Sequence, residues 1–164
     1  MLTQFTTPDE VRAVLAVAEQ ELPDRVINLP MYHRLLQFEL REINTGIEED
    51  YLALPAPEAG SQTAAQELFY NVMQVFAAYS VARQLVGSQP MFAPQVISAS
   101  DTSAQRAADP YESTRASVEA GYNVMLARLK SAYLAIDSSA TLATAVAPVF
   151  ALAVGIATDP VTDT

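Results

Sequence analysis

Apolar and polar residues alternate with a helical period along most of the chain, beginning near the N-terminus. Thr7 is typical of an N-cap, Pro8 of a first helical position, and Glu10 follows the cap by three residues, as in a capping box. The apolar residues that follow recur at spacings of three and four: Val11, Leu15, Ala18, Leu22. They define one face of a helix, and Pro23 ends it. We therefore predict a helix over residues 8–22.

Two further helices are predicted over residues 30–54 and 61–86. Pro30 begins the first, whose apolar positions keep the same spacings: Leu36, Leu40, Ile43, Ile47, Tyr51, Leu54. The second is apolar nearly all round: Leu68, Phe69, Val72, Met73, Val75, Phe76, Tyr79, Val81, Leu85. A helix without a polar face is surrounded by other helices or by other subunits. We therefore place the helix over 61–86 at the centre of the fold.

A fourth helix is predicted over residues 110–136, since Asp109 and Pro110 are typical of a new cap and first turn. Its apolar stripe is regular: Val118, Tyr122, Met125, Leu129, Tyr133, Ile136. No β-hairpin pattern occurs in the sequence. The predicted fold is all-α, a four-helix bundle-like domain over 1–136 with a long loop before its last helix and an extended apolar tail over 137–164.

The loop before the last helix, "QVISASDTSAQRAADPYESTR" (residues 95–115), is longer than most helix–helix connections. Loops of this length are often functional. Asp101 and Arg106 lie five residues apart within it. They either close the loop as an ion pair, bridge subunits, or form an exposed pair that contributes less than about 1 kcal/mol.

The tail, residues 137–164, carries no charge from Thr141 to Thr158. Pro148, Gly155 and the lack of flanking lysine or arginine argue against a membrane-spanning helix, so we expect no membrane insertion. A long apolar stretch is typical of an interaction site. The candidate partner-binding residues are Leu142, Val146, Val149, Phe150, Leu152, Val154 and Ile156.

Composition narrows the possible chemistry. The 164 residues include no cysteine, which excludes disulfides, thiolate metal sites and a cysteine nucleophile. His33 is the only histidine, and no glutamate or second histidine stands at a metal-binding spacing from it. The acidic run Glu48, Glu49 and Asp50 is typical of a solvated helix face. We predict no enzyme activity, no metal site and no cofactor.

Charge predicts that the free protein does not bind DNA. The chain has 19 acidic and nine basic residues, a net charge of −10, and its bases are scattered singly. Nucleic-acid binders instead gather bases into a patch that releases counterions from phosphates. An anisotropy titration with duplex DNA at physiological salt is expected to show no binding. A salt-dependent micromolar affinity would contradict this prediction.

The order of these elements resembles that of head–tail connector, or adaptor, proteins of tailed bacteriophages. The similar stretches include "TTPDEVRAVLAV", "LPMYHRLLQFELREI", "PQVISASDTSAQR" and "DPYESTRASVEAGYNVMLARL". In that family, the loop before the last long helix carries an Ile-Ser-Asp-Gly-like run followed by an arginine. The matching positions here are Ile97, Ser98, Asp101 and Arg106.

The resemblance covers about residues 5–136 and implies a structural role. Such proteins form a ring, typically of twelve copies, beneath the phage portal in the neck of the virion, after synthesis in the host cytoplasm. The ring extends the DNA channel without binding DNA specifically and docks the next neck or tail protein. The C-terminal segment often reaches the portal. This chain departs from the pattern at Thr102, where glycine is usual, and at Ala107, where an aromatic residue often follows the arginine.

Two other functions fit the same sequence. One is a helical protein-binding module that uses the apolar tail to dock a partner without forming a ring. The other is a small helical enzyme or ligand carrier, in which His33 and the acidic run would serve a pocket between helices.

Overall fold

The computed structural model describes residues 1–55, 62–86, 112–137 and 142, and within these ranges the chain is mostly helical and contains no strand. A short 3₁₀ helix, η1 (Leu2–Gln4), precedes six α-helices. These are α1 (Pro8–Leu15), α2 (Asp24–Ile27), α3 (Pro30–Ile43), α4 (Ile47–Ala53), α5 (Ala64–Val86) and α6 (Glu112–Ile136). The predicted all-α fold class is confirmed.

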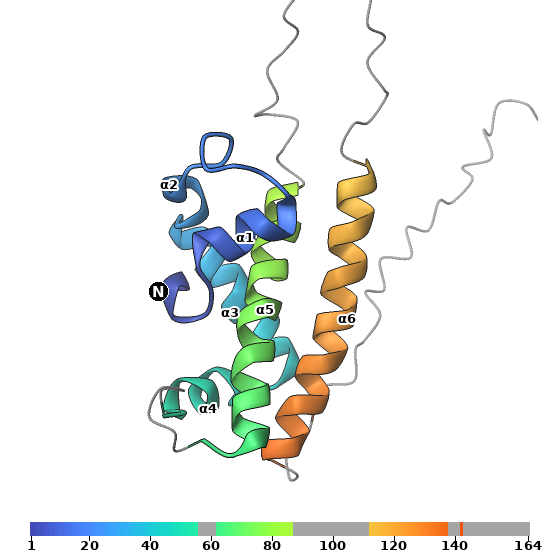
Figure 1. Cartoon of the computed structure of the whole chain (residues 1–164). Helices are drawn as coiled ribbons and strands as arrows, with labels where there is room; N and C mark the ends of the chain where they lie inside the picture. The colour runs from blue at the N-terminus through green and yellow to red at the C-terminus, as the bar shows by residue number, and fades with distance from the viewer. Residues whose placement is uncertain (56–61, 87–111, 138–141, 143–164) are drawn as a thin grey trace, which may run out of the picture.

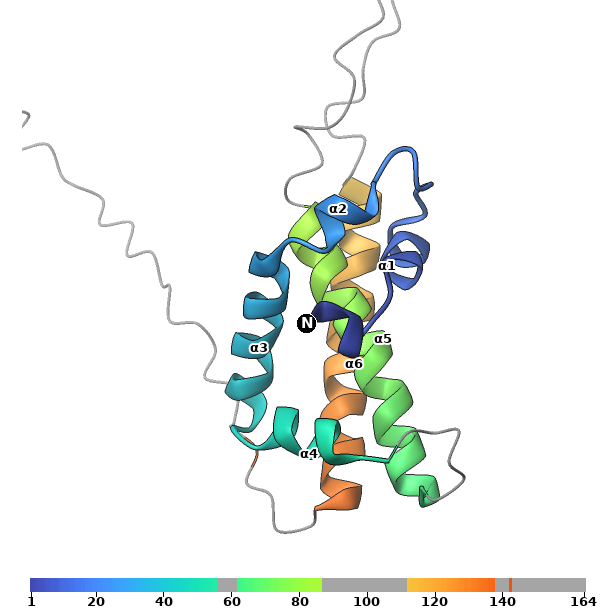
Figure 2. The ribbon, with the colours of Figure 1, turned by 90° about the vertical axis from the view of Figure 1, so that its left-hand side faces the viewer.

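Helix α5 lies at the centre, as its apolar sequence predicted. It packs along α6, which runs antiparallel to it, and it also contacts α1, α3 and α4 (Figure 1). The view in Figure 2 shows helices α3 and α1 on two different sides of α5. Helix α6 therefore forms an edge of the bundle, with its main contact on α5.

The core forms where the predicted stripes meet. Phe69, Met73 and Phe76 of α5 are fully buried, and so is Leu129 of α6. The predicted α6 stripe is confirmed from Val118 to Tyr133. Burying one such large apolar side chain contributes about 1.5–3 kcal/mol.

The predicted helix over 8–22 is shorter than expected. Its capping box is confirmed, because the Glu10 amide donates to the Thr7 hydroxyl and the Thr7 amide donates to the Glu10 carboxylate. The helix ends at Leu15, since Ala16 adopts a left-handed conformation (φ 54°). The guanidinium of Arg12 holds the returning chain by donating to the Leu22 carbonyl (3.2 Å). A tertiary contact thus overrides the helical period of residues 16–22.

The predicted helix over 30–54 is divided into α3 and α4. Asn44 ends α3 in an extended conformation, and its side-chain oxygen accepts a hydrogen bond from the Gly46 amide (2.7 Å). This side-chain turn competes with the helical hydrogen bonds. Ile47 and Tyr51 of α4 are buried after the chain changes direction. The apolar spacing therefore identifies the buried positions correctly, but these positions lie on two helices instead of one.

Candidate interaction surfaces

Most of the residues that the sequence singled out lie outside the described part of the chain. These are Ile97, Ser98, Asp101 and Arg106 of the loop and Val146, Val149, Phe150, Leu152, Val154 and Ile156 of the tail. Leu142 is described, and it packs, partly buried, against the hydrophobic core. The tail therefore meets the bundle at least at this position.

The outward face of α6 is an exposed surface that the sequence analysis did not single out. Its members from residue 116 to residue 135 are Ala116, Ser117, Ala120, Asn123, Val124, Ala127, Arg128, Ser131, Leu134 and Ala135. Arg128 is the one charged residue among them, whereas the first turn of α6, before this stretch, also exposes Glu112 and Arg115. Val124 and Leu134 are 51% and 40% exposed. Small side chains at helical spacing let another helix approach closely, and this spacing was the signal available in the sequence.

A polar cluster joins α3, α5 and α6 on the other side of α6. The Arg83 guanidinium donates to Glu119 (2.8 Å), lies 3.8 Å from a Glu39 oxygen, and stands 4.4 Å above the Tyr122 ring. Gln84 also donates to Glu39 (3.3 Å). Burial, and secondly the Glu39 charge, raise the pKa of Tyr122 to about 12. The cluster ties three helices together beside the ends of α5 and α6, between which the predicted loop runs.

The acidic run on α4 is partly structural. The buried Tyr133 hydroxyl of α6 donates to Asp50 (2.6 Å) and lies 3.4 Å from the Asn44 side-chain oxygen. Glu48 accepts from Gln37 of α3 (2.5 Å). The prediction of a solvated face holds for Glu49 and Asp50, which are both exposed, and Glu48 is partly buried. Two of the three acids thus anchor neighbouring helices.

His33 lines a pocket of about 470 Å³ between the N-terminal residues and α3, together with Asn28, Arg34 and Gln37. Its ring meets Phe5 edge-on, with 5.9 Å between ring centroids. The volume falls within the range of small-molecule sites. Glu48 of the acidic run accepts a hydrogen bond from Gln37, which lines this pocket. If the protein is a ligand carrier, this pocket is the candidate binding site beside His33.

In the described ranges, no three metal-ligating side chains come together. In the part of the chain that the structure describes, no helix has the length and hydrophobicity that a membrane crossing requires. No protein-family model, curated protein or solved structure gives a significant match to the chain.

Proposed function

We propose that this chain is a structural protein of a tailed-phage virion, a head-to-tail adaptor that forms a ring beneath the portal. The ring, of twelve copies by resemblance to known adaptors, would extend the DNA channel and dock the next neck or tail protein. The observation that carries the proposal is the outward face of α6, which is nearly uncharged, rich in small residues and unpartnered within the described bundle.

A ring needs each subunit to present two different faces, because its contacts run head to tail and close by rotation. An edge helix with small outward residues suits one of these faces. Helices in contact lie about 8–10 Å apart, and alanine and serine permit the shorter distances. In this assembly, the α6 face of one copy would pack against a different face of the next copy.

The loop and the tail complete the proposed assembly. Ile97, Ser98, Asp101 and Arg106 belong to the connection between α5 and α6, so the proposed ring would bring this connection to a neighbour or to the lumen. The apolar tail residues would bind the portal, each contributing up to about 1.5–3 kcal/mol before the cost of ordering the segment. Repetition around the ring would strengthen weak individual contacts.

The ring interface can be tested with charges on α6. The double substitution Val124→Glu and Ala127→Glu is expected to leave stability within about 0.5 kcal/mol, because both residues are exposed. Incorporation into virus particles is expected to be lost, since each interface would bury two added carboxylates without a partner. Incorporation is measured by immunoblotting purified particles.

Ala13→Glu, on the exposed side of α1, is the matched control and is expected to assemble normally. Normal incorporation of the α6 double variant would remove this face from the interface and with it the main support for the ring.

A further inference from the structure

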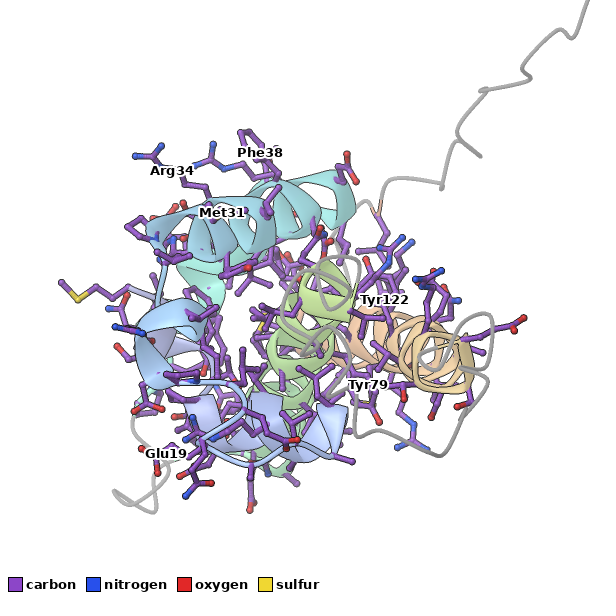
Figure 3. All side chains as sticks on the ribbon, turned by 90° about the horizontal axis from the view of Figure 1, so that it is seen from above. Glu19, Met31, Arg34, Phe38, Tyr79 and Tyr122 are labelled. Carbon is purple, nitrogen blue, oxygen red and sulfur yellow. The ribbon has the colours of Figure 1, made fainter. Side chains whose placement is uncertain are left out.

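The outward side of α3 presents a row in which apolar and cationic residues alternate. Met31, Arg34, Phe38 and Arg41 follow one another at spacings of three, four and three, which places them on one helix face. Met31 is 51% exposed and Phe38 is 62% exposed. Figure 3 shows Arg34 and Phe38 pointing away from the bundle. We call these four residues the α3 row.

The two arginines of the α3 row have no hydrogen-bond or ion-pair partner within the described ranges, whereas Arg12 and Arg83 each pair with two carboxylates. Glu39, on the same helix, faces Arg83 instead. In a chain with a net charge of −10, the α3 row is thus a local cationic and apolar surface, bordered at its end by the exposed Glu42. Its complement is a segment that is apolar and acidic.

Residues 143–164 of the same chain have that character. They carry Val149, Phe150 and Leu152 among other apolar residues, and their only charged side chains are Asp159 and Asp163. A lysine or arginine, which the α3 row would repel, does not occur after Lys130.

The described contacts bring the start of this segment to one end of the α3 row. Tyr133, in the last turn of α6, lies 3.4 Å from the side chain of Asn44, the residue that ends α3. Leu142 packs back against the core, so the chain has returned to the bundle before residue 143. The 14 residues of α3 span about 21 Å, and even a fully helical segment of 22 residues would span about 33 Å. The segment is long enough to cover the row.

We infer that in the free protein residues 143–164 lie along the α3 row of their own chain, with apolar side chains on Met31 and Phe38 and the two aspartates near Arg34 and Arg41. Attachment to the same chain favours this contact, because the local concentration of a tethered segment is high. The inference does not rest on the ring. If the segment also binds a portal, the portal must displace it from α3.

The absence of cysteine permits a direct test in the full-length protein. A spin label at Thr162→Cys is expected to reduce the amide NMR signals of Met31, Arg34 and Phe38 and to spare Val124 on α6. A label at Ala13→Cys on α1 controls for nonspecific loss. A second sample mixes isotope-enriched chain without a spin label and spin-labelled chain without isotope enrichment. Signal loss in this mixture can arise only from contact between copies, which distinguishes it from contact within one chain.

Signal loss confined to α3 and absent from the mixture supports the inference. Signal loss at α3 in the mixture would instead indicate contact with a second copy and overturn the inference. Signal loss at other residues, or none at all, would also overturn it. Arg34→Glu with Arg41→Glu is expected to abolish the effect at α3. Adding Asp159→Arg and Asp163→Arg is expected to restore it, which a merely structural role of the arginines would not produce.

Discussion

The substitution Gly121→Val is expected to lower the free energy of unfolding by about 2 kcal/mol, because it overpacks the contact between α5 and α6. A β-carbon placed on Gly121 would lie 2.2 Å from Cε1 of Tyr79 and 2.7 Å from Cζ. Figure 3 shows Tyr79 of α5 directed toward α6. The ring must therefore move, or the two longest helices must separate. Urea unfolding followed by circular dichroism measures the loss.

Two further variants test the cause of this loss. Ala120→Val changes the neighbouring exposed position of α6 and is expected to alter stability by no more than about 0.5 kcal/mol. The double variant Tyr79→Ala, Gly121→Val is expected to lose less unfolding free energy than the two single variants lose in total. Removing the ring makes room for the valine. If Gly121→Val alone were as stable as the parent protein, the close approach of α5 and α6 would be wrong.

Alkaline pH is expected to destabilise the protein steeply above about pH 10, the usual pKa of tyrosine. The pKa values of Tyr51, Tyr122 and Tyr133 are all raised, and burial is the largest cause for each. The pKa of Tyr122 is raised to about 12. For Tyr51 the charge of Tyr70 adds to burial, and for Tyr133 the hydrogen bond to Asp50 does.

The sign of this effect follows from proton binding. Above pH 10 the unfolded chain releases phenolic protons that the folded chain keeps, so stability falls as pH rises. Each tyrosine can contribute a slope of up to about 1.4 kcal/mol per pH unit, and three together up to about 4 kcal/mol.

Urea unfolding at a series of pH values from 8 to about 11 measures this slope. Tyr122→Phe, Tyr51→Phe and Tyr133→Phe are each expected to reduce it by about one third, and none should change the pH dependence below pH 9. A stability that stays constant from pH 8 to pH 11 would contradict the burial of these hydroxyls.

The sequence predicts the helices better than their ends. The period of three and four identifies α5 and α6, because each buries a continuous stripe against neighbours. It cannot reveal that Arg12 reaches the Leu22 carbonyl, or that the Asn44 side chain bonds the Gly46 amide. Both contacts end helices whose apolar spacing continues, and both depend on where the chain goes next. One helix was therefore predicted too long because of a tertiary contact, and the other because of a local side-chain turn.

The candidate surfaces show a similar division. Sequence patterns drew attention to the apolar tail, because a long uncharged stretch is visible without a structure. The spacing of small residues on α6 and of the α3 row is visible in the sequence, but it does not show exposure, since alanine, valine or methionine at helical spacing can face either the core or the solvent. Only the packing of α5 against α6 shows that Val124 and Ala127 lie outside. In the same way, Phe38 belongs to the apolar class but is exposed.

The proposed ring is tested most directly by looking for the chain in purified particles of the proposed tailed phage. Mass spectrometry would measure its copy number per particle, and cryo-electron microscopy would show where it lies. We expect about twelve copies in a closed ring between portal and tail, with neighbouring subunits in contact through α6. Particles that lack the chain, or that carry it as isolated monomers away from the neck, would contradict the proposed ring.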